Sequence, residues 1–124
     1  MSSGKLPQVI SGYFTGALRR VKLSLGGHVF DFIVDTGFEG EVAIDSQTAD
    51  LAKLKIIGLG SLKAFDGRDS SCIVASSTMD WFGNQRRCSV DISEFGYRLI
   101  GMGLLREANV EVDFYKQLVK LSLK

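Results

Sequence analysis

The triplet Asp35-Thr36-Gly37 places an acid, a hydroxyl and a glycine directly after the apolar run 32–34. A carboxyl group held at the end of a buried strand can accept or donate a proton, so this position suits general acid or base chemistry. The same three residues also suit an ordinary turn, because Asp caps turns and Gly tolerates positive φ. Taken alone, the triplet favours the ordinary turn.

A second segment, far downstream, changes this balance. Leu99-Ile100-Gly101 precedes a leucine pair and an expected strand at 110–114. With this segment the chain resembles the retropepsins, the single-lobed aspartic peptidases of clan AA. The resemblance runs from about residue 18 to 114, with a catalytic loop, a helical turn, a flap and the downstream segment in family order.

The chain is most similar to the bacterial and archaeal members, in which Phe follows the triplet as Phe38 does here. The resemblance implies a small closed β-barrel-like fold and a homodimer, in which each copy supplies Asp35 to a shared site on a two-fold axis. The chemistry agrees, because hydrolysis of an amide by water needs both a base and an acid. Two facing carboxyls share a proton, so one can act as the base and the other as the acid.

The resemblance also assigns supporting roles. Thr36 would hydrogen-bond the two loops to each other across the axis, and Gly37 would let the substrate approach. Leu99 and Ile100 would pack beneath the loop, while Gly101 would permit a crowded crossing of chain segments. A core strand followed by a turn explains the last three residues equally well.

Substrate contacts are expected from two places. The segment 62–71 would be the flap, with Phe65, Asp66 and Gly67 at or near its tip, closing over an extended peptide that pairs with it as an added strand. An ordinary surface hairpin is the alternative. Phe38 is expected to line a substrate pocket or to fill the core.

The chain departs from the viral enzymes at the expected dimer interface. Met102 stands where those enzymes commonly have Arg, so an ion pair with Glu39 cannot form there. Arg106 could replace the missing cation, although a charge on the helix surface explains it as well. Residues 115–121 continue beyond the point where short viral chains stop, so the terminal strands that join the subunits are expected to be arranged differently.

The glycine-rich pattern, with 14 Gly and one Pro, predicts a mostly β fold with one or two short helices. We expect one domain over 1–124, with 1–12 as a loose N-terminal segment. Alternating strands predict an opening hairpin over 14–34 with its turn at Gly26-Gly27. The other elements expected are strands at 42–44, 62–65, 72–82, 86–92, 110–114 and 115–123 and helical turns at 47–54 and 104–108.

Composition excludes several other functions. With 15 Lys plus Arg against 14 Asp plus Glu, the net charge of +1 does not favour nucleic acid as a partner. No apolar run reaches the roughly 20 residues that cross a membrane, so we expect a cytoplasmic protein. His28 has no second histidine to help it bind a metal. Cys72 and Cys88 are expected to be free thiols, and Arg86-Arg87 to be solvated.

The sequence therefore predicts a homodimeric aspartic endopeptidase that cleaves extended polypeptides at mildly acidic pH, without metal or organic cofactor. A catalytically silent peptide-binding or assembly module with the same fold is one alternative. A regulatory domain whose partner supplies the other half of the site is a second, and it predicts a monomer in isolation.

Overall fold

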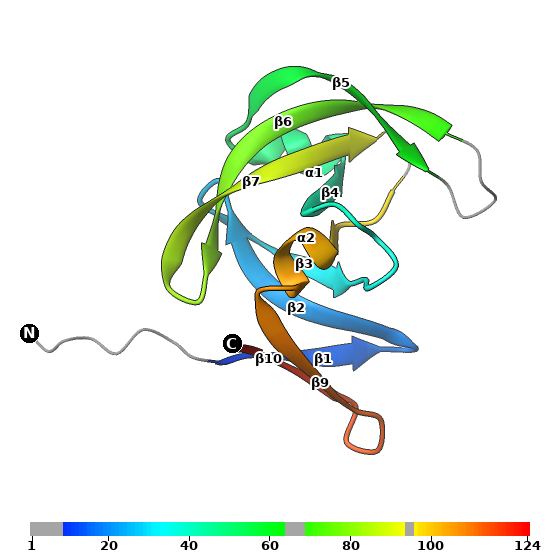
Figure 1. Ribbon diagram of the computed structural model, residues 1–124, viewed down its shortest axis with the longest axis vertical. Helices are drawn as coiled ribbons and strands as arrows, with labels where there is room; N and C mark the ends of the chain where they lie inside the picture. Colours follow the sequence, from blue (N-terminus) through cyan, green and yellow to red (C-terminus); the bar gives the residue numbers. More distant parts are fainter. Residues whose placement is uncertain (1–8, 64–68, 94–95) are drawn as a thin grey trace, which may run out of the picture.

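The computed structural model describes residues 9–63, 69–93 and 96–124, and it is mostly β, as predicted (Figure 1). No helix in these ranges is long and apolar enough to cross a membrane. They contain ten strands and two short helices: β1 Val9–Thr15, β2 Leu18–Leu25, β3 His28–Val34, β4 Val42–Asp45, α1 Ser46–Leu51, β5 Lys55–Lys63, β6 Asp69–Trp81, β7 Asn84–Ser93, β8 Leu99–Ile100, α2 Met102–Leu105, β9 Ala108–Asp113 and β10 Leu118–Leu123.

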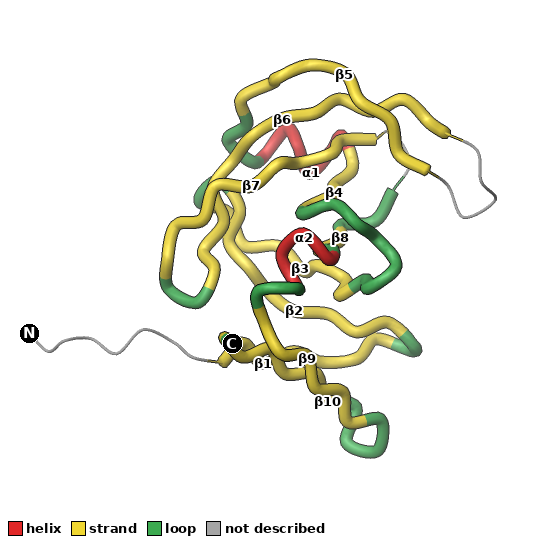
Figure 2. Tube along the Cα trace, viewed as in Figure 1, coloured by secondary structure: helices red, strands yellow, loops and turns green. Residues whose placement is uncertain are grey.

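The strands of the described residues form one sheet in the order β5-β6-β7-β4-β8-β3-β2-β1-β10-β9. The sheet curls back on itself, because β2 also pairs with β6 through Leu25 and Met79. Figure 2 shows β5, β6, β7 and α1 at one end of the molecule and β1, β9 and β10 at the other, with α2 between them.

Alternation along the strands builds the core. In β2, Val21, Leu23 and Leu25 are buried, whereas Lys22 between them is exposed. Burying a side chain of this size stabilises a fold by about 1.5–3 kcal/mol. The largest fully buried side chains come from strands on both sides of the curl, from the turn between β6 and β7, and from α2: Phe32, Phe82, Leu25, Ile44, Met79, Ile100, Leu104 and Leu121.

The predicted opening hairpin is confirmed from Leu18 onward, whereas the expected start at residue 14 is wrong because residues 14–15 belong to β1. β2 pairs antiparallel with β3 from Arg20–Ile33 to Leu25–His28. Gly26 and Gly27 form the turn with φ of 61° and 88°, a backbone conformation that residues other than glycine rarely adopt. The two glycines thereby fix the register that brings β3 to the Asp35 loop.

The prediction of a loose N-terminal segment over 1–12 is wrong for residues 9–12, because these residues belong to β1. Ile10 pairs with Leu121 and Gly12 with Val119, both in β10. The partner strand lies at the opposite end of the chain, so a local pattern does not reveal the pairing. Residues 1–8 lie outside the described part of the chain.

The β5–β6 hairpin has longer arms than the sequence pattern predicted. β5 begins at Lys55 rather than at residue 62, and its pairing with β6 continues to Lys63 opposite Asp69. The expected flap tip, Phe65, Asp66 and Gly67, lies outside the described residues.

Candidate active site

The triplet Asp35-Thr36-Gly37 forms a tight turn directly after β3. The Asp35 N–H donates to the carbonyl oxygen of Ile100 at 3.0 Å, and the Phe38 N–H donates to the carbonyl oxygen of Asp35 at 3.2 Å. Within the turn, the Gly37 N–H donates to Asp35 Oδ1 at 2.9 Å. These bonds fix both the backbone and the carboxyl group of Asp35.

The segment expected beneath this loop lies beside it. β8 runs between β3 and β4, parallel to the first and antiparallel to the second. Leu99 pairs with Ile33 on one side and with Ala43 on the other, and its side chain is half-buried. Ile100 is fully buried in the core. Through these two residues, β8 connects β3, which leads into the loop, with β4, which follows the loop.

Gly101 marks a crowded crossing between this segment and the loop. Its N–H donates to the Glu41 carbonyl oxygen at 3.0 Å, and the Met102 N–H donates to the Phe38 carbonyl oxygen at 2.7 Å. A Cβ atom at Gly101 would lie 2.4 Å from the Phe38 carbonyl oxygen and 2.5 Å from that of Gly40. Only glycine fits here without a backbone shift.

The tip of the loop faces solvent. Thr36 and Gly37 are exposed, whereas Asp35 and Phe38 are half-buried. Among the described residues, the Thr36 hydroxyl has no hydrogen-bond partner. The Phe38 ring packs against Gly40 and therefore belongs to the wall of the loop rather than to the central core.

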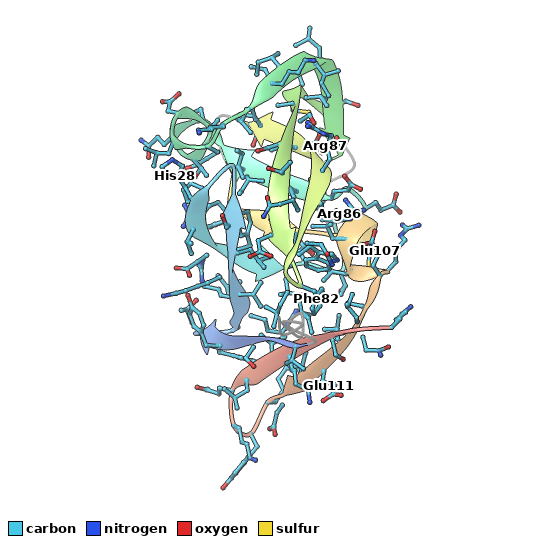
Figure 3. The ribbon with its side chains drawn as sticks, turned by 90° about the vertical axis from the view of Figure 1, so that its left-hand side faces the viewer. His28, Phe82, Arg86, Arg87, Glu107 and Glu111 are labelled. Atoms are coloured by element: carbon cyan, nitrogen blue, oxygen red, sulfur yellow. The ribbon has the colours of Figure 1, made fainter. Side chains whose placement is uncertain are left out.

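Arg86, which was expected to be solvated, instead anchors the loop. Its Nη2 contacts Glu41 Oε2 at 3.0 Å and Glu107 Oε2 at 2.6 Å, and its Nε donates to Glu107 Oε1 at 3.0 Å. Glu41 Oε1 also accepts from the Ser89 N–H at 2.7 Å. Figure 3 shows Arg86 and Glu107 next to each other on the face of the molecule. The network connects β7, the end of the loop and the residues after α2.

Arg86 supplies the loop with a cation that Met102 cannot provide. Its side chain is only 22% exposed. Hydrogen bonding to Glu107, followed by that to Glu41, raises the pKa of its guanidinium further above the ordinary value. Within the described chain, Arg106 forms no ion pair with Glu39, and its Nε donates to the Met102 carbonyl oxygen at 2.9 Å. No local signal marks Arg86, which lies 45 residues from Glu41.

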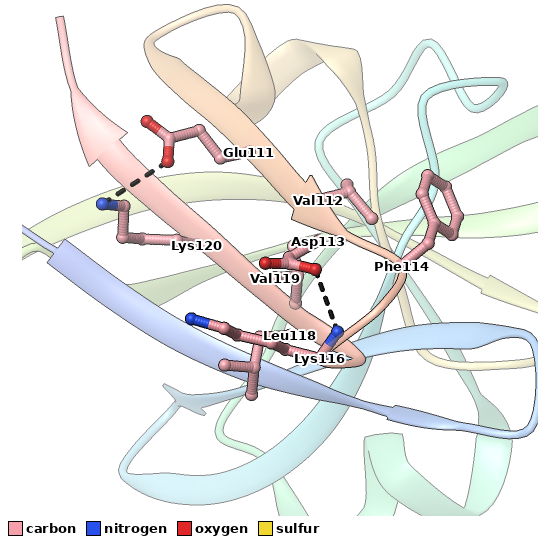
Figure 4. A pocket seen from close by; sticks show the side chains of 8 residues that line it. All are labelled: Glu111, Val112, Asp113, Phe114, Lys116, Leu118, Val119 and Lys120. Carbon is pink, nitrogen blue, oxygen red and sulfur yellow. Dashed lines mark hydrogen bonds and ion pairs between the residues drawn. The ribbon is translucent and has the colours of Figure 1, made fainter.

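Two surface hollows among the described residues lie away from Asp35. One adjoins the turn between β9 and β10, where Glu111 pairs with Lys120 at 3.4 Å and the Lys116 N–H donates to Asp113 (Figure 4). The other lies beside α1 and the Gly26–Gly27 turn.

Neither cysteine has the surroundings of a nucleophile. Cys72 and Cys88 are free and buried, as expected, and burial raises the pKa of both thiols. Cys88 pairs with Ser77, an odd number of positions from Cys72, so the two thiols lie on opposite faces of the β6–β7 ribbon. Among the described residues, no group of three or more His, Cys, Asp or Glu side chains could hold a metal ion.

Three solved structures with a similar fold are aspartic proteases. A retropepsin-like aspartic protease from Rickettsia conorii matches with a TM-score of 0.65 and 16% identity, over 93% of this chain and 90% of that chain. The EIAV protease complexed with the inhibitor HBY-793 matches with a TM-score of 0.65 and 10% identity, over 76% and 90%. The simian foamy virus (mac) protease matches with a TM-score of 0.52 and 15% identity, over 70% and 91%. No protein-family model and no curated protein matches the chain. The chain thus has the fold of the retropepsin-like aspartic proteases.

Proposed function

We propose that the chain is an aspartic endopeptidase of the bacterial and archaeal retropepsin type, which hydrolyses extended polypeptides with Asp35 from each of two copies. The observation that carries the proposal is the position of Asp35. Its carboxyl is held by the Gly37 N–H, at the end of a strand braced by Ile100, in a fold shared with aspartic proteases.

In the proposed mechanism, a water molecule lies between the two Asp35 carboxyls. Like charges at such short range cannot both persist, so the pair shares one proton. The ionised carboxyl takes a proton from the water as it attacks the amide carbon, and the protonated carboxyl donates to the carbonyl oxygen. The resulting intermediate then breaks its C–N bond as the nitrogen gains a proton. No metal or organic cofactor takes part.

A second copy of the chain is required by this chemistry, because the sequence contains a single Asp-Thr-Gly triplet. Two surface features support a homodimer. Thr36 is exposed with no hydrogen-bond partner among the described residues, as expected of a residue that bonds to a second copy. β10 fills the place between β1 and β9 within one chain, which leaves β9 at the end of the strand order with an edge for a partner.

A catalytically silent peptide-binding or assembly module is the second candidate, and Met102 is the feature that favours it. The absence of a cation at this position would loosen the loop of a protein that no longer needs its catalytic geometry. Arg86 weakens this argument, since it provides the Glu41 end of the loop with a cation from β7. The intact Asp35 triplet also favours the peptidase.

The test is cleavage of a mixed peptide library at several pH values and protein concentrations, by the wild type and by Asp35→Asn. Cleavage should be greatest at mildly acidic pH and absent in the variant, and it should fall faster than linearly on dilution. Sedimentation under the same conditions gives the oligomeric state. A confirmed dimer that cleaves nothing would identify the silent module, and an inactive monomer would direct the search to a partner that supplies the other half-site.

A further inference from the structure

A row of paired residues crosses five strands next to the Asp35 loop. Val74 pairs with Asp91, Asp91 with Ala43, Ala43 with Leu99, and Leu99 with Ile33. Residues that lie opposite each other on neighbouring strands project from the same face of a sheet. The row therefore places one carboxyl, that of Asp91, among four apolar side chains.

The same face carries Asp35. In the parallel pairing of β3 with β8, the Ile33 N–H donates to the Arg98 carbonyl oxygen at 2.8 Å and the Asp35 N–H donates to that of Ile100 at 3.0 Å. The ladder thus continues through Asp35, two positions after Ile33, and side chains two positions apart in an extended strand project from one face. Asp91 and Asp35 lie on one surface.

Asp91 reaches the loop itself. A Cβ atom built at Gly40 would lie 3.3 Å from Asp91 Oδ2 and 2.5 Å from Cζ of Phe38, so the carboxyl and the ring both border Gly40. Asp91 is half-buried, and burial raises the pKa of its carboxyl. Among the side chains that the structure describes, none forms a hydrogen bond or ion pair with it. Val74 and Leu99 in the same row are likewise half-buried.

A carboxylate in such surroundings lacks the partner that would compensate for its lost hydration. A Lys or Arg side chain supplies that partner, since its cationic end forms charge-assisted hydrogen bonds and its aliphatic stem packs on apolar neighbours. A single carboxylate does not provide the ligand set of a divalent cation. The side chains of this row are therefore better suited to bind a basic side chain than a metal ion.

We propose that Asp91 is a specificity-determining residue that selects polypeptides with a Lys or Arg side chain near Phe38. This inference rests on the proposed peptidase function, because it places the substrate on the Asp35 face. Leu99, Val74 and the Phe38 ring would contact the stem of the basic side chain, and the Asp91 carboxylate would bind its charged end.

The test uses peptides that carry either Lys or Gln at one position, moved stepwise through four positions on each side of the cleaved bond. At one position, the wild type should give a kcat/KM roughly tenfold higher for Lys than for Gln, the size expected of a hydrogen bond to a charged group. Asp91→Asn keeps the shape of the side chain and should bring this ratio close to one. Glu111→Gln makes the same chemical change in β9, at the other end of the strand order, and should keep the ratio.

A binding measurement separates this inference from the proposed catalysis. Fluorescence anisotropy with Asp35→Asn and with the double variant Asp35→Asn, Asp91→Asn should show tighter binding of the Lys peptide only where Asp91 is present. Cleavage that depends on Asp35, with a ratio unchanged by Asp91→Asn, would overturn the role of Asp91 and leave the peptidase intact. If the Lys peptide binds more tightly only where Asp91 is present, but the wild type cleaves no peptide, the role of Asp91 is supported and the proposed peptidase activity is contradicted.

Discussion

The loop 35–41 and the outer strand of the β5–β6 hairpin are held in different ways. The loop accepts backbone hydrogen bonds from Gly101 and Met102 and carries an ion pair from Glu41 to Arg86. β5 lies at the end of the strand order and pairs with β6, and its Ile57 and Leu59 are 64% and 85% exposed. The difference indicates that the fold fixes the geometry of the Asp35 loop closely and leaves the surface of β5 free to change.

The largest effect is expected from the same substitution at two glycines, one in each region. Gly101→Ala should destabilise the protein by about 3 kcal/mol, because its Cβ would lie 2.4 Å from a backbone oxygen that cannot move alone. Gly58→Ala in β5 should change the free energy of unfolding by less than about 1 kcal/mol, since no atom lies within 4 Å of its Cβ position. Urea denaturation of both variants gives the two values.

Equal losses in the two variants would contradict the comparison, since they would mean that the crossing at Gly101 relaxes as easily as an open strand. If Gly101→Ala has normal stability but no longer cleaves peptides, the comparison between the two regions becomes sharper. In that case the crossing would serve to shape the loop and would contribute little to the fold.

A smaller effect is expected at the neighbouring arginines of β7. Arg86→Gln leaves Glu41 and Glu107 without their cation and should destabilise the protein by about 1–2 kcal/mol, a value reduced by the partial exposure of all three side chains. Arg87→Gln removes a contact with Ser76 Oγ at 2.9 Å on an exposed surface and should change stability by less than about 0.5 kcal/mol.

Urea denaturation at low and high salt measures this difference. Added salt should reduce the loss in Arg86→Gln only in part, because the network is partly shielded from solvent. If the two variants lose equal stability, Arg86 is an ordinary surface charge, as the sequence suggested, and it does not anchor the loop.

Sequence patterns predicted those parts of the fold that depend on neighbouring residues. Alternation and the glycine pair revealed the hairpin of β2 and β3. β1 was missed because its partner, β10, lies at the other end of the chain. The pairing of distant strands is decided by packing, which a short window of sequence does not contain.

The residues of the candidate site fall into the same two groups, those predicted from a local motif and those that depend on residues distant in the sequence. Asp35 and Gly101 were identified because each belongs to a short motif, and the structure brings them together through β8. Arg86 was missed because its two carboxylates lie 45 and 21 residues away. Asp91 is only one more acid in an alternating strand until the register of four neighbouring strands places it beside the loop.

The smallest effect is expected at Asp91, which lies between the two regions because it pairs with β4 on one side and with β6 on the other. Burial raises the pKa of this carboxyl in the folded protein above its value in the unfolded chain. The folded state therefore favours the protonated form. Its contribution to stability is fully present below the ordinary pKa and is lost as the pH rises through the folded-state pKa.

Asp91→Asn carries no charge at any pH, so it should be more stable than the wild type at pH 7. This advantage should shrink as the pH falls through the raised folded-state pKa of Asp91 and vanish below the ordinary pKa of an Asp carboxyl. Thermal unfolding of both proteins between pH 3 and pH 7 measures the difference, with Glu111→Gln as the control for a carboxyl on an exposed strand. An advantage that grew toward acidic pH would mean that Asp91 is stabilised as a carboxylate by a partner in its own chain. A basic substrate side chain would then have no unmet charge to bind, so the sign of this small change also tests the proposed specificity.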